Sequence, residues 1–405
     1  MLMFAKYGHK AFPFINSLDN FYSKQHPNGY ICREFLEKNG RDFYSSETNP
    51  KAVNPPLFAW AEVESFKLTG DKERLKNVLP VLERYVAWLE KGRKSNNTVH
   101  KLYWTSNFAS GMDNSPRSGS GWVDISSQMV IQYNSMAYIS DVLEFPGKAK
   151  YFEKRAKDIS EQINQWMWNN KDGLYYDIDD SGNQVKRQTI ASFWPMLAKI
   201  PSTNQEKQLL KNLKDPKKFW RKIVFPTLSA SDKDYNSYGG YWRGAVWAPT
   251  NMAVIKGLEA EGYQKVAYEA SLKYLKGMNE VFKKTGTVWE NYAPDYYSQG
   301  KPAKSKFVGW SGCGPITLLI ENIIGIKCDA YKRTIEWNVN RLDRHGIKNL
   351  KFADFTTSLI ADEREDINAP LTIRVQTNKK FKLIVNKNND IREINIYPGD
   401  NKITF

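Results

Sequence analysis

Two carboxylic acids lie in segments suited to acid–base chemistry. Asp113 stands in "SNFASGMDNSPRSGSGW" (106–122), a stretch rich in glycine and serine that ends in an indole. Glu290 stands in "GTVWENYAPD" (286–295), between a tryptophan and a tyrosine-bearing turn. Apolar neighbours raise the pKa of a carboxyl group, because burial disfavours the charged form, and a general acid needs that property.

A pair of carboxyl groups is what cleavage of a glycosidic bond requires. One acid protonates the leaving oxygen, while the other carboxylate activates water or attacks the sugar. Arg117 and Arg243, the latter in "YGGYWRGAVWAPTN" (238–251), are suited to hold a carboxylate or sugar hydroxyls. Each acid taken alone has a plainer interpretation, Asp113 as a turn residue and Glu290 as the partner of a lysine.

The aromatic content points the same way. Aromatic residues make up 14% of the chain, with 13 Trp. The flat face of an indole matches the C–H face of a pyranose, although a Trp-rich core would explain the same count. A fourth segment, "FVGWSGCGP" (307–315), again combines aromatics with glycine.

Composition argues against several other classes of function. The formal charge of +15 suggests a nucleic-acid partner, but the Lys and Arg residues are scattered and no nucleic-acid-binding motif is present. Three widely spaced Cys and four His without ligand spacing predict no metal site, and no cofactor is implied. No apolar run approaches the roughly 20 residues of a membrane helix, so no membrane partner is expected.

Up to about residue 325 the periodicity is helical. Polar-faced helices are predicted in 71–92, 149–168 and 262–282, with Asp71 as an N-cap of the first. Less charged segments, 124–143 and 247–258, are apolar or small nearly all round and should be buried. This alternation favours two concentric helical layers carrying long loops.

After about residue 327 the pattern changes to alternation at period two. "IEWNVN", "LTIRVQT", "KKFKLIVN" and "IREINIYPGDNKITF" predict strands, with "YPGDN" as a turn between strands. We therefore expect a helical catalytic domain over 1–326 and a small antiparallel, sandwich-like β domain over 327–405.

The four loop segments resemble a known family when they are taken together. "SGMDNSPR", "GGYWRGAVWAPTN", "WENYAP" and "GWSGCGPITLLIE" are similar to the helical domain of glycoside hydrolase family 63 and its relatives, the family 37 trehalases and the mannosylglycerate-hydrolase-like bacterial glycosidases. The similarity runs in order through nearly all of residues 1–325.

The resemblance implies an (α/α)6 barrel, six outer and six inner helices, with the active site at the loop-bearing end. It implies that Asp113 is the general acid and Glu290 the general base of an inverting glycosidase, with the two carboxyl groups about 6.5–9.5 Å apart. It further implies substrate-binding residues around the sugar: Arg117, Trp242, Arg243 and Trp310, with Trp60, Trp104, Asn114, Trp247, Asn251 and Tyr292 as additional candidates.

This sequence departs from the family pattern at its start. Family members carry a Trp-Asp pair on a helix just upstream of the point where this chain opens with "MLMFAKYG". The resemblance therefore implies a fragment or a late start, with the N-terminal part of the barrel truncated. A periplasmic or secreted location would follow by analogy if an export signal lies upstream, and a cytoplasmic one otherwise.

The predicted activity is hydrolysis of α-glucosidic linkages in an oligosaccharide or small α-glycoside. A trehalase or another hydrolase of small α-linked glycosides is the alternative within this class. A carbohydrate-binding protein without catalysis is the alternative from another class, although a degenerate binder would tend to lose one of the two acids.

Overall fold

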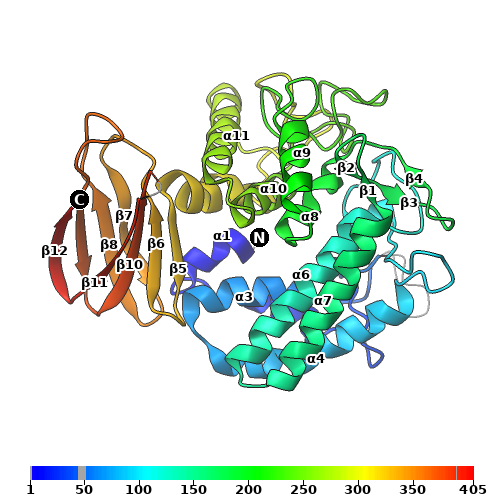
Figure 1. Ribbon diagram of the computed structural model, residues 1–405, viewed down its shortest axis with the longest axis horizontal. Helices are drawn as coiled ribbons and strands as arrows, with labels where there is room; N and C mark the ends of the chain where they lie inside the picture. Colours follow the sequence, from blue (N-terminus) through cyan, green and yellow to red (C-terminus); the bar gives the residue numbers. More distant parts are fainter. Residues whose placement is uncertain (1, 44–51, 389) are drawn as a thin grey trace. The chain divides into compact units, whose positions relative to one another are not determined.

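The structure, a computed structural model, describes residues 2–43, 52–388 and 390–405 (Figure 1). The chain is mainly helical up to Ile324 and consists of strands after it. Contacts divide it into two compact units. Unit 1 comprises Met1–Asn16, Ala61–Lys72 and Gly312–Phe405, and unit 2 comprises Ser17–Trp60 and Glu73–Ser311. All the predicted site residues belong to unit 2.

The long helices of unit 2 confirm the predicted alternation between one-sided and all-round burial. Their bounds are α4 Lys72–Gly92, α6 Val123–Val142, α7 Pro146–Trp166, α10 Ala248–Ala260 and α11 Gln264–Thr285. In α7 only one stripe is buried, through Phe152, Ala156, Ile159 and Ile163, whereas α6 is buried on nearly every face. The two helices pack along each other (Figure 1), so α7 shields α6 from water.

Shorter elements connect these helices. They are α2 Asn16–Tyr22, α5 Asn107–Ser110, η2 Ile190–Phe193, α8 Trp194–Leu197, α9 Thr203–Leu213, and two hairpins, β1 Trp168–Asn169 with β2 Leu174–Tyr175 and β3 Asp177–Ile178 with β4 Gln184–Val185. The second hairpin contains "DIDDSGNQ". Asp179 closes its turn by accepting from the backbone N–H groups of Ser181 and Asn183. These bonds form a tight turn between β3 and β4.

The helical part of unit 1 surrounds one buried ammonium group. It comprises α1 Leu2–Ala5, η1 Lys6–Gly8, α3 Phe58–Thr69, η3 Trp310–Cys313 and the π-helix η4 Gly314–Ile324, and α3 and η3 begin in unit 2. Lys6 lies 2.9 Å from Glu64 and 3.1 Å from Glu321. A buried cation is tolerated only when it is paired in this way, so these contacts fix η1 between α3 and η4.

The C-terminal strands form two four-stranded sheets (Figure 1) with the orders β11-β10-β6-β5 and β12-β9-β8-β7. Their bounds are β5 Ile326–Asp329, β6 Thr334–Asn338, β7 His345–Phe352, β8 Phe355–Ala361, β9 Thr372–Thr377, β10 Phe381–Lys387, β11 Asp390–Ile396 and β12 Gly399–Thr404. Side chains of both sheets, Trp337 and Leu383 from one and Leu359 and Val375 from the other, share one apolar core. The pairing is antiparallel except between β10 and β6, which run parallel.

The predicted "YPGDN" turn does connect two strands. It links β11 to β12, and these strands belong to different sheets, so the turn crosses the sandwich instead of closing a hairpin. The domain boundary at residues 326 and 327 stays a prediction, although β5 begins at Ile326. Among the described residues, no helix combines the length and the apolarity needed to cross a bilayer.

One carboxyl group outside the predicted site makes stability depend on pH. Glu261 ends α10, and burial, together with the nearby Glu206, raises its pKa from about 4.5 to about 7, against a smaller opposing effect of Lys199. The folded state therefore holds this proton more tightly than the unfolded state does. We expect the free energy of unfolding to fall as the pH rises from about 4.5 to about 7.

Urea unfolding at pH 5 and pH 8 checks this expectation, with Glu261→Gln as the comparison. The amide cannot ionise, so the variant should lose part of the difference in stability between the two pH values. An equal difference in the two proteins would assign it to other groups.

Candidate active site

The loop that carries Asp113 is built from a short capped helix. The Ser106 hydroxyl accepts a hydrogen bond from the Ala109 N–H at the start of α5, and Gly111 ends the helix with a left-handed φ of 77°. Asn107 then donates to the Ser115 carbonyl at 2.9 Å, which closes the turn around Asp113. Local hydrogen bonds thus place the acid at the tip of a rigid loop.

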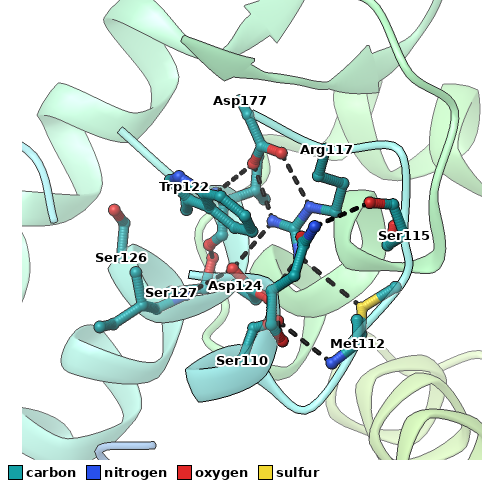
Figure 2. A network of polar contacts seen from close by, with 12 residues as sticks. Ser110, Met112, Ser115, Arg117, Trp122, Asp124, Ser126, Ser127 and Asp177 are labelled. Carbon is teal, nitrogen blue, oxygen red and sulfur yellow. Dashed lines mark hydrogen bonds and ion pairs between the residues drawn. The ribbon is translucent and has the colours of Figure 1, made fainter. Parts of the chain in front are cut away.

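A buried arginine anchors the other end of this loop (Figure 2). The Arg117 guanidinium donates to Asp124 at 2.6 and 2.9 Å and to Asp177 at 2.8 Å twice. A further N–H points to the Met112 sulfur at 3.7 Å, and Trp122 lies 4.4 Å from the guanidinium carbon. All five N–H groups of a guanidinium are then in use, so Arg117 has none left for a sugar hydroxyl.

Gly119 allows the same loop to approach the β3–β4 hairpin closely. Its φ is 124°, and a Cβ at this position would lie 2.4 Å from the Ile178 carbonyl oxygen. Ser120 and Gly121 both donate to that carbonyl, at 2.9 and 3.0 Å. A side chain would break this contact, which explains the glycine.

Asp113 itself is partly buried, and two polar groups face it. Its carboxyl side chain is 34% exposed and lies 3.8 Å from the Arg33 guanidinium. Burial raises its pKa and the nearby Glu34 adds to this effect, while Arg33 and the Tyr241 hydroxyl lower the pKa without cancelling the rise. A carboxyl group with a raised pKa keeps its proton to higher pH, as a general acid must.

Glu290 lies on a second loop and is 4% exposed. Its backbone N–H donates to the Lys304 carbonyl at 2.9 Å, and its carboxylate accepts from the Lys304 N–H at 3.3 Å. The indole N–H of Trp310 donates to the Glu290 carbonyl at 3.2 Å. These contacts fix both the backbone and the side chain of Glu290.

The Tyr241 phenol interacts electrostatically with both acids. Burial raises the pKa of its phenol, and the carboxyl groups of Asp113 and Glu290 raise it further. The phenol is thus within electrostatic reach of both carboxyl groups. Its backbone has a φ of 64°, an uncommon conformation for an aromatic residue and one that tends to occur at functional sites.

Aromatic rings line the same region. Trp242 and Trp247 stack with ring centroids 4.0 Å apart and planes at 7°. Trp310 lies 5.7 Å from Trp247 and 4.7 Å from Phe307, and it is only partly buried. Trp242 and Trp247 are 6% and 1% exposed, so among these three indoles only Trp310, beside Glu290, offers a face on which a pyranose ring can stack.

Asn114 joins the Asp113 loop to the segment that bears the tryptophans. Its side chain accepts from the Trp242 N–H at 2.8 Å and donates to the Gly240 carbonyl at 3.0 Å. The exposed Arg243 donates through Nε to the Asn114 carbonyl at 3.2 Å. Arg243 therefore has N–H groups left to meet a ligand, whereas the Asn114 side chain is occupied.

Two of the predicted substrate contacts are fully enclosed. The Asn251 amide accepts from the Phe225 N–H at 2.6 Å and donates to the Phe225 and Trp247 carbonyls at 3.0 and 3.1 Å. Tyr292 is 1% exposed, and its hydroxyl accepts from the Trp289 N–H at 3.2 Å. Both side chains position loops, so the structure favours a supporting role for them over direct contact with substrate.

The last two candidates, Trp60 and Trp104, also belong to unit 2. Trp60 is partly buried near the start of α3. Trp104 is 37% exposed and lines a surface hollow whose lining includes neither Asp113 nor Glu290. The structure thus brings together Asp113, Asn114, Trp242, Arg243, Trp247, Glu290 and Trp310, whereas Trp104 lines a hollow to which none of them contributes.

Three residues of this region were not predicted from the sequence. Arg33 reaches the Asp113 loop, where it donates to the Phe108 carbonyl across 75 residues of sequence and lies over that ring at 4.6 Å. Tyr241 stood inside a quoted motif without being singled out, and Asp177 lies outside the four quoted loop segments. Of the three, only Tyr241 could have been found from its local sequence, because it stands between two glycines and a tryptophan in "GGYW".

Comparison with known proteins places this site in a family. Residues 16–311 match the model of the mannosylglycerate hydrolase MGH1-like glycoside hydrolase domain. A protein of Borreliella burgdorferi is 29% identical over 372 residues, which cover 89% of this chain and 77% of that protein. A probable mannosyl-oligosaccharide glucosidase of Schizosaccharomyces pombe is 23% identical over 290 residues, 62% of this chain and 34% of that protein.

A solved structure shares the fold. The GH63 mannosylglycerate hydrolase from Thermus thermophilus, in complex with glucose, superposes with a TM-score of 0.61 at 18% identity and covers 74% of this chain and 87% of that one. The predicted fold class, a helical barrel with a small C-terminal β part, is therefore confirmed. With the family model spanning most of the chain, this protein belongs to the MGH1-like family of glycoside hydrolase domains related to family 63, and it is a glycoside hydrolase.

Proposed function

We propose that the chain is an inverting, exo-acting α-glycosidase that cleaves α-glucosidic linkages. The observation that carries this proposal is a series of contacts that joins the loops bearing Asp113 and Glu290. Asn114 accepts from the Trp242 N–H and the Trp242 ring stacks on Trp247. Trp310 lies beside Trp247 and donates to the Glu290 carbonyl. Two carboxyl groups in one region, one of them with a raised pKa, match the acid and base of glycoside hydrolysis. The glucosidase name of the yeast relative and the glucose in the solved structure support the choice of sugar.

In this mechanism Asp113 gives its proton to the glycosidic oxygen while Glu290 takes a proton from the attacking water. Inversion requires room for that water, so the carboxyl groups should lie about 6.5–9.5 Å apart. Trp310 would stack on the sugar, with the buried Trp242 and Trp247 behind it, and Arg243 would bind the sugar hydroxyls. Arg117, Asn114, Asn251 and Tyr292 would position the loops.

A trehalase is the second candidate, because trehalose is also an α-linked glucose disaccharide and the sequence resembles the trehalases as well. The name of the Thermus relative adds mannosylglycerate as a substrate to test. A carbohydrate-binding protein without catalysis is disfavoured by the presence of both acids.

Proton NMR of the reaction mixture tests both substrate and stereochemistry. Maltose, kojibiose, trehalose and 2-O-α-mannosylglycerate are each mixed with the chain, and the anomeric signals are followed from the first minutes. For an inverting enzyme we expect the glucose cut from the non-reducing end of maltose or kojibiose to appear as β-glucose, in excess over its equilibrium share, and trehalose to give α- and β-glucose in equal amounts. An early excess of α-glucose from maltose or kojibiose, or α-glucose alone from trehalose, would overturn inversion, and release of mannose alone would overturn the glucosidic specificity.

The pH profile offers a finer test of the acid. The Tyr241 hydroxyl lowers the pKa of Asp113, so Tyr241→Phe should raise that pKa. The general acid would then stay protonated to higher pH, and the basic limb of the kcat/KM profile should move upward. The control is Tyr238→Phe, an exposed tyrosine stacked on Tyr296, which should leave the profile unchanged. A basic limb that stays in place or moves down would contradict the role of Tyr241.

A further inference from the structure

A hollow of about 460 Å³ lies on the surface of unit 2, apart from the residues assigned to catalysis. Residues of the 91–98 segment form one side of it, Gly119 and Ser120 form another, and Trp104 and Asp180 complete the lining. Neither Asp113 nor Glu290 is among these residues. The size is that of a small-molecule site, and the mixture of one indole with many polar groups differs from an ordinary apolar pocket.

Trp104 is held as a rigid platform in this hollow. Its ring lies 4.3 Å from the guanidinium carbon of Arg93, which is only 3% exposed and also lies over Trp88 at 5.5 Å. The indole therefore rests on a buried cation and is not free to collapse into the hollow. At 37% exposure, Trp104 retains surface for a ligand. A flat, fixed indole is what stacking against the C–H face of a pyranose requires.

The two loops beside Trp104 are fastened to each other. The Ser95 hydroxyl donates to the Ser120 carbonyl at 2.6 Å, and the Thr98 hydroxyl donates to the Ser95 carbonyl at 2.8 Å. His100 contacts the Ser120 hydroxyl at 3.1 Å. The wall of the hollow is thus organised before any ligand arrives, which lowers the entropic cost of binding.

The polar groups that remain available suit sugar hydroxyls. Within the described ranges, the side-chain amides of Asn96 and Asn97 have no hydrogen-bond partner, and both residues are exposed. Lys91 supplies further donors and the exposed Asp180 supplies acceptors. Lys94 already pairs with Glu90 at 3.4 Å, so the lining carries both signs of charge and does not select an anion. Donors and acceptors around one indole match a neutral, hydroxyl-rich ring.

We propose that this hollow is a second saccharide-binding site, in which a neutral pyranose stacks on Trp104 and hydrogen-bonds to Asn96, Asn97 and Lys91. The residues that line this hollow do not include Asp113 or Glu290, so the proposal does not depend on which glycosidic bond these two acids cleave. It would hold a sugar unit of a larger glycan, or a separate sugar molecule, away from the reacting bond.

The indole N–H signal of Trp104 provides a direct test. The protein is labelled with ¹⁵N and carries Glu290→Gln so that probes survive, and the Trp104 signal is identified by its loss in Trp104→Phe. Maltose, trehalose and methyl α-D-mannopyranoside are titrated to about 100 mM, since weak sugar sites bind in the millimolar range. We expect the Trp104 signal to shift and to saturate with at least one probe, with little change between low and high salt.

Two variants separate this site from the catalytic region. Asn97→Ala should raise the dissociation constant measured from the Trp104 signal about threefold or more, as expected for one lost hydrogen bond. Trp310→Ala, which removes the indole beside Glu290, should leave that constant unchanged. The proposal is overturned if no probe moves the Trp104 signal, or if Trp310→Ala abolishes the shift while Asn97→Ala does not affect it.

Discussion

Replacement of Asp113 by Asn is expected to lower kcat by about 10²- to 10⁴-fold on a disaccharide, because the amide cannot donate the proton that the leaving sugar needs. On an aryl glucoside the loss should be much smaller, since a good leaving group departs without protonation. Glu290→Gln should instead slow both substrates severely, because the attacking water loses its base in either case. Steady-state kinetics on the two substrate types therefore assigns the acid and the base separately.

A matched control shows that the effect is local. Asp158 lies on the exposed side of α7, where it pairs with Lys154, and Asp158→Asn should retain normal turnover. Circular dichroism of the three variants should be unchanged, because neither Asp113 nor Glu290 takes part in an ion cluster of the core. An Asp113→Asn protein that hydrolyses the disaccharide at the normal rate would remove Asp113 from the mechanism.

The helices of unit 2 could be predicted from sequence because their signal is local. Leu75, Val78, Leu82 and Val86 recur at helical spacing, and all of them are buried in α4. The sandwich was harder to predict. Period-two alternation identified several of its strands, but the parallel pairing of β10 with β6 joins segments far apart in the chain, and no local pattern encodes such a pairing.

The site shows the same limit at the level of single side chains. Sequence alone could not tell which candidates contact the substrate directly, because the side chains of Arg117, Asn251 and Arg243 can all hydrogen-bond to a sugar. Their partners, which are distant in sequence, distinguish them. Arg117 donates its N–H groups to Asp177, and the Asn251 side chain binds the Phe225 backbone. Arg243 stays exposed. Arg33 was missed for the converse reason, because its contact with the Asp113 loop exists only in the folded chain.

Arg117 provides the sharpest test of that distinction. The guanidinium is the cation that Asp124 and Asp177 share, and the side chains of all three are at most 7% exposed. Arg117→Met would leave two buried carboxyl groups without a counter-ion, and we expect a loss of about 3–5 kcal/mol in the free energy of unfolding. Burial already raises the pKa of Asp177, and Arg117 opposes that rise.

The pH dependence of the Arg117→Met defect follows from the same cause. Without Arg117, the pKa of Asp177 in the folded state should rise further above its unfolded value. Asp177 then takes up a proton as the pH falls, so the penalty should be smaller near pH 5 than near pH 8. Arg374→Met removes an exposed pair with Asp362 and should cost less than about 1 kcal/mol. Urea unfolding of both variants at the two pH values measures these differences. A normally stable Arg117→Met protein with only a raised KM would instead make Arg117 a substrate ligand, as the sequence resemblance implied.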